Sequence, residues 1–86
     1  MRIDILLNKL CIVKTRSIAK NACDKGVIFL NQKAAKASQE TRTDDIIEIN
    51  MFGYKTTIKI KKIPEGNVSK KDVLEYYEVM SREASY

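Results

Sequence analysis

The spacing of apolar residues changes part-way along this chain, and that change most constrains its fold. Near the start, apolar side chains recur three, one and three positions apart, which is the stripe of a helix: Ile3, Leu6, Leu7 and Leu10. Over residues 56–62 the chain alternates instead, with Ile58 and Ile60 on one face and lysines on the other, as in a half-buried antiparallel strand. Helices that precede strands in this way predict an α+β fold.

A second helix is predicted directly after the first, which covers residues 3–13. Asp4 is the expected N-cap of the first helix and Thr15 that of the second, while Gly26 supplies the left-handed residue that ends the second. The buried stripe of the second helix consists of Ile18, Ala19, Ala22 and Cys23. We expect both helices to pack on a small, mostly antiparallel sheet.

Short strands joined by turns are predicted from residue 27 onward. The segments are a strand at 27–30, a turn at 31–33, a strand at 34–38, a loop at 39–45, a strand at 46–49, a turn at Phe52-Gly53 and the alternating strand. After a break at residues 64–67, Ser69 and Asp72 resemble a capping box. Apolar residues at helical spacing then predict a C-terminal helix over 69–84: Val73, Leu74, Tyr77 and Met80.

The composition excludes common kinds of catalytic and metal site. The 86 residues include no histidine, which excludes Ser/His/Asp and Cys/His triads and any His-ligated metal. The two cysteines cannot close a four-ligand zinc site, and their apolar neighbours favour a role as small hydrophobes. A chain of this length also leaves little room for a deep enzymatic cleft. We therefore expect no enzyme, no catalytic residue, no metal and no cofactor.

No targeting or membrane-spanning segment is predicted. The apolar stretch at 5–13 is interrupted by Asn8 and Lys9, so it is too short and too polar for a signal peptide or a span. The chain has no internal repeat and no linker. We expect one cytoplasmic domain over 1–86, made of a core at 1–52, a hairpin completed by 53–63 and the C-terminal helix.

The positive charge is concentrated in the first half of the chain. Residues 1–43 hold nine basic and three acidic side chains, whereas residues 44–86 hold seven and eight. Such an imbalance indicates a surface that binds a polyanion. Lys59 and Lys61 fit a solvated strand face that protects a sheet edge better than a binding site.

The residues that carry a family likeness lie mainly in this basic half. They are Arg2-Ile3-Asp4 with Leu6-Leu7, Lys14-Thr15-Arg16-Ser17, Ala19-Lys20, Ala22, Gly26, Ile28, Asn31, Lys36-Ala37-Ser38 and Asp45-Ile46. In this pattern the chain resembles the S4 RNA-binding domain. The hairpin and C-terminal segment extend the likeness to the compact S4 proteins of the heat-shock and ribosome quality-control type, and most of all to the RqcP type.

This resemblance implies an αL RNA-binding motif and a cytoplasmic factor of the large ribosomal subunit. Such a factor would contact rRNA and peptidyl-site tRNA on subunits that carry a stalled nascent chain, and would support tailing of that chain by the partner RqcH. It would be a monomer off the ribosome. The matched contact candidates are Arg2, Lys14, Thr15, Arg16, Ser17 and Lys20 from the helices, with Asn31, Lys36 and Ser38 from the strand part. Asp4 is expected to cap the helix or to orient a neighbouring arginine, because a bare carboxylate repels phosphate.

Two positions depart from the family pattern. Family members often have Asn-Gly where this chain has Asn31-Gln32, and Pro-Gly-Asp where it has Thr43-Asp44-Asp45. Glutamine at positive φ is strained, so the first turn is expected to be of another type or one residue longer. Asp44 adds an acid beside the expected RNA surface.

Two other functions remain open at this point. The first is an S4 module of an RNA-modifying enzyme such as a pseudouridine synthase, which would need a separate catalytic domain. The second is a protein-interaction module that uses an exposed patch of Tyr76, Tyr77, Met80 and Tyr86.

Overall fold

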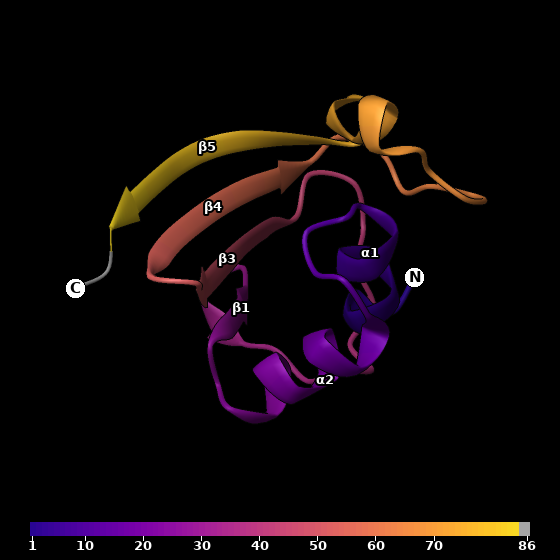
Figure 1. Cartoon of the computed structure of the whole chain (residues 1–86). Helices are drawn as coiled ribbons and strands as arrows, with labels where there is room; N and C mark the ends of the chain where they lie inside the picture. Colours follow the sequence, from indigo (N-terminus) through magenta and orange to yellow (C-terminus); the bar gives the residue numbers. More distant parts are fainter. Residues whose placement is uncertain (85–86) are drawn as a thin grey trace.

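The computed structural model describes residues 1–84, which form an α+β fold of two helices, a short 3-10 helix and one five-stranded sheet. The elements in chain order are α1 (Ile3–Lys9), α2 (Arg16–Asp24), β1 (Ile28–Leu30), β2 (Lys33–Ala34), β3 (Ile46–Met51), β4 (Tyr54–Ile60), η1 (Lys70–Glu75) and β5 (Tyr77–Ala84). The sheet has the order β2-β1-β3-β4-β5, and every neighbouring pair is antiparallel. Figure 1 shows α1 and α2 together on the concave side of the curved sheet. The predicted α+β fold with two N-terminal helices on the sheet is confirmed.

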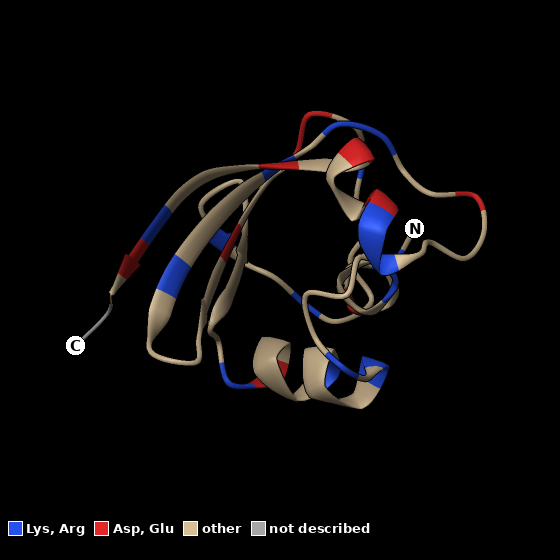
Figure 2. Cartoon of the chain, turned by 45° about the horizontal axis from the view of Figure 1, so that its top comes forward, with Lys and Arg blue, Asp and Glu red and all other residues tan. Residues whose placement is uncertain are grey.

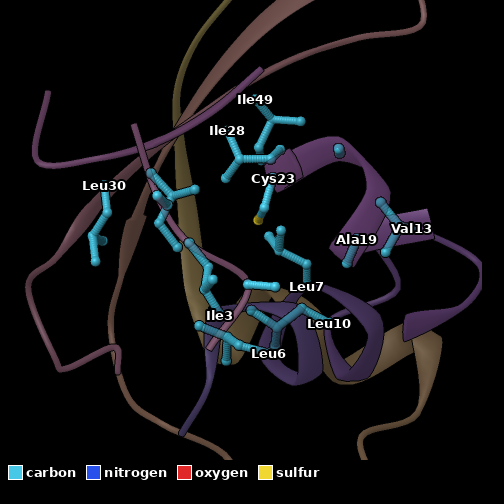
Figure 3. Close-up of a cluster of buried hydrophobic side chains, with 14 of the residues drawn as sticks. Ile3, Leu6, Leu7, Leu10, Val13, Ala19, Cys23, Ile28, Leu30 and Ile49 are labelled. Carbon is cyan, nitrogen blue, oxygen red and sulfur yellow. The ribbon is translucent and has the colours of Figure 1, made fainter. Parts of the chain in front are cut away.

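Buried apolar side chains from both helices and from the three central strands form one core (Figure 3). Ile3, Leu6 and Leu7 of α1 are fully buried, as are Ile28 and Ile47 of the sheet. Each fully buried side chain of this size contributes about 1.5–3 kcal/mol. The stripe predicted from the sequence is therefore what attaches the helices to the sheet.

The ends of the helices follow the prediction in part. Thr15 caps α2, because its side-chain oxygen accepts a hydrogen bond from the Ile18 amide at 3.1 Å, and Gly26 has a φ of +74° after the helix. The N-cap of α1 is Arg2, so the prediction of Asp4 was wrong. Asp4 is the second residue of the helix, in its first turn, where its carboxylate accepts hydrogen bonds from two arginines. Helix α1 also stops at Lys9, because Cys11 turns the backbone to a φ of 60°.

Two tight turns set the register of the sheet. Leu30 pairs with Lys33 and Met51 with Tyr54, so each turn has two central residues, and all four of these have positive φ. The expectation of a longer or different turn at Asn31-Gln32 was wrong. The Asn31 side chain accepts a hydrogen bond from the Ile46 amide at 3.0 Å and donates one to Asp45 at 3.1 Å, and these bonds offset the strain at Gln32.

The strand predicted at 34–38 ends at Ala34. Beyond it, Ala35 still donates its amide hydrogen bond to the Ile28 carbonyl, but the chain then turns, with the Gln39 amide donating to the Lys36 carbonyl. Ala35 and Ala37 are buried in the core instead of continuing the strand.

The C-terminal helix predicted over 69–84 was wrong beyond residue 75. The helix after Ser69 is the short η1, and residues 77–84 form β5, which pairs with β4 over the whole length of that strand. A strand here satisfies the backbone N–H and C=O groups along the open edge of β4, which a helix cannot do. Lys59 and Lys61 therefore belong to or follow an interior strand and protect no edge. Leu74 and Met80, half of the presumed buried stripe, are 59% and 56% exposed.

The residues of the proposed protein-interaction patch do not share one face. Tyr76 and Tyr77 are half-buried and pack against the core, whereas Met80 points outward from β5. Tyr86 lies outside the described residues. Within residues 1–84, no helix has the length and apolarity needed to cross a membrane.

Cys23 is a buried, free thiol in the core, as predicted, and burial raises its pKa. Cys11 is exposed in the loop between the helices, so the expectation of a hydrophobic role was wrong for it.

Candidate nucleic-acid interface

A buried carboxylate joins the starts of the two helices. Asp4 Oδ2 accepts hydrogen bonds from Arg2 Nη2 at 3.0 Å and Arg16 Nε at 3.2 Å, while Oδ1 accepts from Arg2 Nε at 3.2 Å and the Ile5 amide at 2.8 Å. The Asp4 side chain is 1% exposed, whereas those of Arg2 and Arg16 are 38% and 53% exposed. Two guanidinium groups from different helices are thus fixed by one acid, with their outer parts in water.

The charge of this acid is stable at neutral pH. Burial alone would raise the pKa of Asp4, but the hydrogen bonds from Arg16, the Ile5 amide and Arg2 outweigh it, so the pKa lies below its ordinary value of 3.8. Asp4 is therefore ionised and neutralises one of the two arginine charges. The sequence-based expectation that Asp4 orients an arginine is confirmed by this geometry. Arg2 and Arg16 thus share an acidic partner, although residues 1–43 hold nine basic side chains and only three acidic ones.

The oriented arginines keep hydrogen-bond donors for a ligand. Arg16 uses only Nε within residues 1–84, so both of its terminal amino groups are open, and Arg2 Nη1 is open as well. Arg16 is the first residue of α2, whose N-terminal amides and dipole also attract an anion. A guanidinium fork beside a helix N-terminus is suited to phosphate.

The other helical candidates surround this point. Lys14 and Ser17 are exposed on either side of the Thr15 cap, and Lys20 lies one turn along the face that carries Arg16. Neither Lys14 nor Lys20 forms an ion pair with any described residue. Figure 2 shows basic positions along α2, with an acidic one at its end, and a mixture of basic and acidic positions on η1 and β5.

The loop at residues 36–41 brings two strand-part candidates to the same place. The amides of Ile3 and Asp4 donate hydrogen bonds to the carbonyls of Gln39 and Ala37, at 2.8 and 3.3 Å. This docking sets exposed Lys36 and Ser38 beside the start of α1. The same loop also carries an acid, Glu40, whose carboxylate pairs with the amino group of Met1 at 2.7 Å.

Asn31 is set apart from the cluster. Its side-chain amide is engaged with Asp45 and Ile46, so the structure gives it a role in the turn. Asp44, the acid noted in the loop at 39–45, is exposed and lies 3.8 Å from Lys59.

Sequence reasoning missed Phe52, a 74% exposed aromatic residue at the tip of the β3–β4 hairpin. Its only signal was a large apolar residue inside a turn.

Comparison with known proteins identifies the family. The S4 domain model matches residues 1–47, which is more than half of the chain. A relative from Helicobacter pylori strain J99, the RQC P-site tRNA stabilizing factor, is 34% identical over 84 residues, covering 96% of this chain and 100% of the relative. The protein of that name from Streptococcus pneumoniae strain R6 is 32% identical over 81 residues, covering 94% of this chain and 91% of the relative. The chain belongs to this family.

Two solved structures share the fold of this RQC P-site tRNA stabilizing factor family member. Vibrio cholerae Heat Shock Protein 15, whose structure is trimeric, matches with a TM-score of 0.88 and 26% identity over 94% of this chain and 82% of its own. The solution structure of the hypothetical protein HP1423 matches with a TM-score of 0.81 and 34% identity over 96% of this chain and 100% of its own. The resemblance drawn from the sequence is confirmed at the level of the family and the fold.

Proposed function

We propose that this chain is a non-enzymatic RNA-binding factor of the large ribosomal subunit. It binds rRNA and peptidyl-tRNA on subunits that carry a stalled nascent chain, and so takes part in their quality control. The observation that carries the proposal is the pair of guanidinium groups fixed by buried Asp4 at the start of α2. The names of the relatives, which refer to stabilisation of P-site tRNA, support the choice of ligand.

The chemistry of the pair suits structured RNA. A-form RNA displays phosphates and 2′-hydroxyls at regular spacing, while its base edges are hard to reach, so recognition depends on shape and charge. Arg2 and Arg16 would bind two phosphates with their open amino groups. Lys14, Lys20 and Lys36 would add charge around them, and Thr15, Ser17 and Ser38 would lie within reach of sugar or phosphate oxygens. Asn31 contributes through the turn that it holds.

Several finer features belong to the same proposal. The factor would act in the cytoplasm as one domain, be a monomer off the ribosome and support tailing of the stalled chain by RqcH. The alternative of a module within an RNA-modifying enzyme gains no support from the comparisons, because the relatives matched over nearly their full length are named RQC P-site tRNA stabilizing factors.

Co-sedimentation with purified large subunits tests the proposal. Arg16→Ala should lower affinity about 10- to 100-fold, because a hydrogen bond between charged groups contributes about 1.5–3 kcal/mol. Lys71→Ala is the matched control, since Lys71 is exposed on η1 and forms no ion pair within residues 1–84.

Salt dependence gives a second readout. If about four to six phosphates are contacted, log affinity should fall with log salt at a slope of about −3 to −5. Equal binding of Arg16→Ala and wild type, or a flat salt response, would contradict the proposed site.

A further inference from the structure

Neither the backbone conformation nor the packing at position 52 favours a phenylalanine. Phe52 occupies the first position of the β3–β4 turn with a φ of 58°, a conformation that favours Asn, Asp or Gly and is uncommon for a bulky residue. It is also 74% exposed, so packing does not compensate. A binding role would explain an exposed aromatic side chain on a strained backbone.

Phe52 borders a groove between the hairpin tip and the two helices. Three adjoining hollows of about 680, 350 and 170 Å³ all have Phe52 in their walls. Ile12 and Ile18 each line two of them, and Met51 lines the two smaller ones, so the floor is apolar. The largest hollow is within the size range of small-molecule sites.

The rim of the groove is basic. Lys14 and Lys70 line the largest hollow, Lys25 the second and Arg82 the third, and no acidic residue lines any of them. None of the three lysines forms an ion pair with a described residue. An occupant that matches both floor and rim has a flat apolar part and a negative charge.

The groove adjoins the start of α2, the helix whose first residue is Arg16, because Lys14 and Ile18 both line it. Lys14, on its rim, precedes Thr15 and Arg16 at the start of α2. A strand of RNA whose phosphates lie on Arg16 therefore has a short path into the groove. A nucleotide has both required parts, since its base is a flat ring and its phosphate is an anion.

We propose that this groove binds an unpaired nucleobase of the bound RNA, stacked on the ring of Phe52, with its flanking phosphates on Lys14 and Lys70. The inference rests on the proposed function for the identity of the RNA. Stacking of one base on an aromatic side chain corresponds to about 5- to 150-fold in affinity.

Binding to large subunits tests the proposal first. Phe52→Ala should lower affinity about tenfold or more, while Phe52→Tyr, which keeps the ring, should stay within about twofold of wild type. Leu74→Ala is the matched control, because Leu74 is a 59% exposed apolar residue outside the groove. The salt slope of Phe52→Ala should equal that of wild type, because lost stacking releases no counterions, whereas Arg16→Ala should make the slope shallower.

A single-stranded RNA octamer with one 2-aminopurine provides an independent probe. Stacking on Phe52 should quench its fluorescence in wild type and in Phe52→Tyr, and the quenching should be lost in Phe52→Ala. If wild type fails to bind large subunits yet quenches the octamer through Phe52, the proposed function fails and the groove proposal stands.

The opposite result would overturn the groove proposal while leaving the proposed function in place. If large subunits bind through Arg16 but Phe52→Ala matches wild type in both assays, the groove proposal is overturned and the proposed function stands. A change of oligomeric state in Phe52→Ala, with RNA binding intact, would assign the groove to a second copy of the chain and overturn the proposal as well.

Discussion

Replacing Asp4 with asparagine tests whether the buried carboxylate orients the two arginines. The amide has nearly the shape of the carboxylate, so it opens no cavity, but its NH₂ group must face donors. With the NH₂ group in place of Oδ2, the hydrogen bonds from Arg2 Nη2 and Arg16 Nε are both lost. With the amide flipped, those from Arg2 Nε and the Ile5 amide are lost instead.

The size of the effect follows from these contacts. A hydrogen bond to a charged group contributes about 1.5–3 kcal/mol, and we take about half of that here because the arginine side chains are 38% and 53% exposed. Losing two such bonds should lower the free energy of unfolding by about 1.5–3 kcal/mol. For a domain of this size, the melting temperature should fall by about 10–20 °C.

Urea unfolding followed by circular dichroism measures this change, and RNA binding gives the decisive comparison. Asp4→Asn makes the chain one unit more positive, so a simple count of charges predicts tighter binding to large subunits. Orientation of the arginines predicts weaker binding under conditions where the variant is folded. Asp72→Asn is the control, since it changes the charge equally at an exposed position on η1. Wild-type stability in Asp4→Asn, or binding tighter than wild type, would refute the reasoning.

Three further predictions follow from individual contacts. Because the folded-state pKa of Asp4 lies below 3.8, its stabilisation is complete above that pH and is lost as the pH falls through the lower folded-state value, so the acid limb of a stability–pH curve should be flatter in Asp4→Asn. Arg16→Ala should cost about 1 kcal/mol or less in urea unfolding, since Asp4 keeps Arg2; a loss above about 3 kcal/mol would mean that Arg2 does not hold the acid. Thr15→Ala should cost about 1 kcal/mol through the lost cap of α2, with exposed Thr43→Ala unchanged, and equal melting temperatures would contradict the capping role.

The helices and the central strands could be predicted from the sequence because their signals are local. Thr15 and Gly26 mark the ends of α2 by backbone chemistry alone, and the alternation at Ile58 and Ile60 needs only one buried face. The prediction of a C-terminal helix was wrong because the apolar spacing of the segment was outweighed by the hydrogen-bonding requirement of a strand elsewhere in the chain. The open edge of β4 needed a partner strand, and no property of residues 77–84 taken alone reveals that edge.

The residues proposed for the candidate site could be listed from the sequence, but the contacts between them could not. Lys14, Arg16 and Lys20 stand close together in the sequence, so their common surface followed from α2 and the residues that lead into it. The contact between Arg16 and Asp4 spans 12 residues and exists only because α1 and α2 pack together, so it could not be read from spacing. Phe52 carries no periodic signal, and its exposure depends on where the hairpin tip ends.

An acid at the centre of the proposed RNA-binding surface is explained by the conformational entropy of the arginine side chains. A free arginine side chain carries about 2 kcal/mol of rotamer entropy, part of which is lost whenever it binds a phosphate. Asp4 removes that freedom before RNA arrives, at the cost of one neutralised charge, and it sets the two guanidinium groups at a fixed separation. The long-range attraction of RNA to this surface becomes weaker because one charge is neutralised. Binding of phosphates at the matching spacing loses less side-chain entropy. Arg2→Lys and Arg16→Lys should therefore bind large subunits less tightly than wild type despite equal charge, because an ammonium group cannot hold the carboxylate and present a second donor in the same plane.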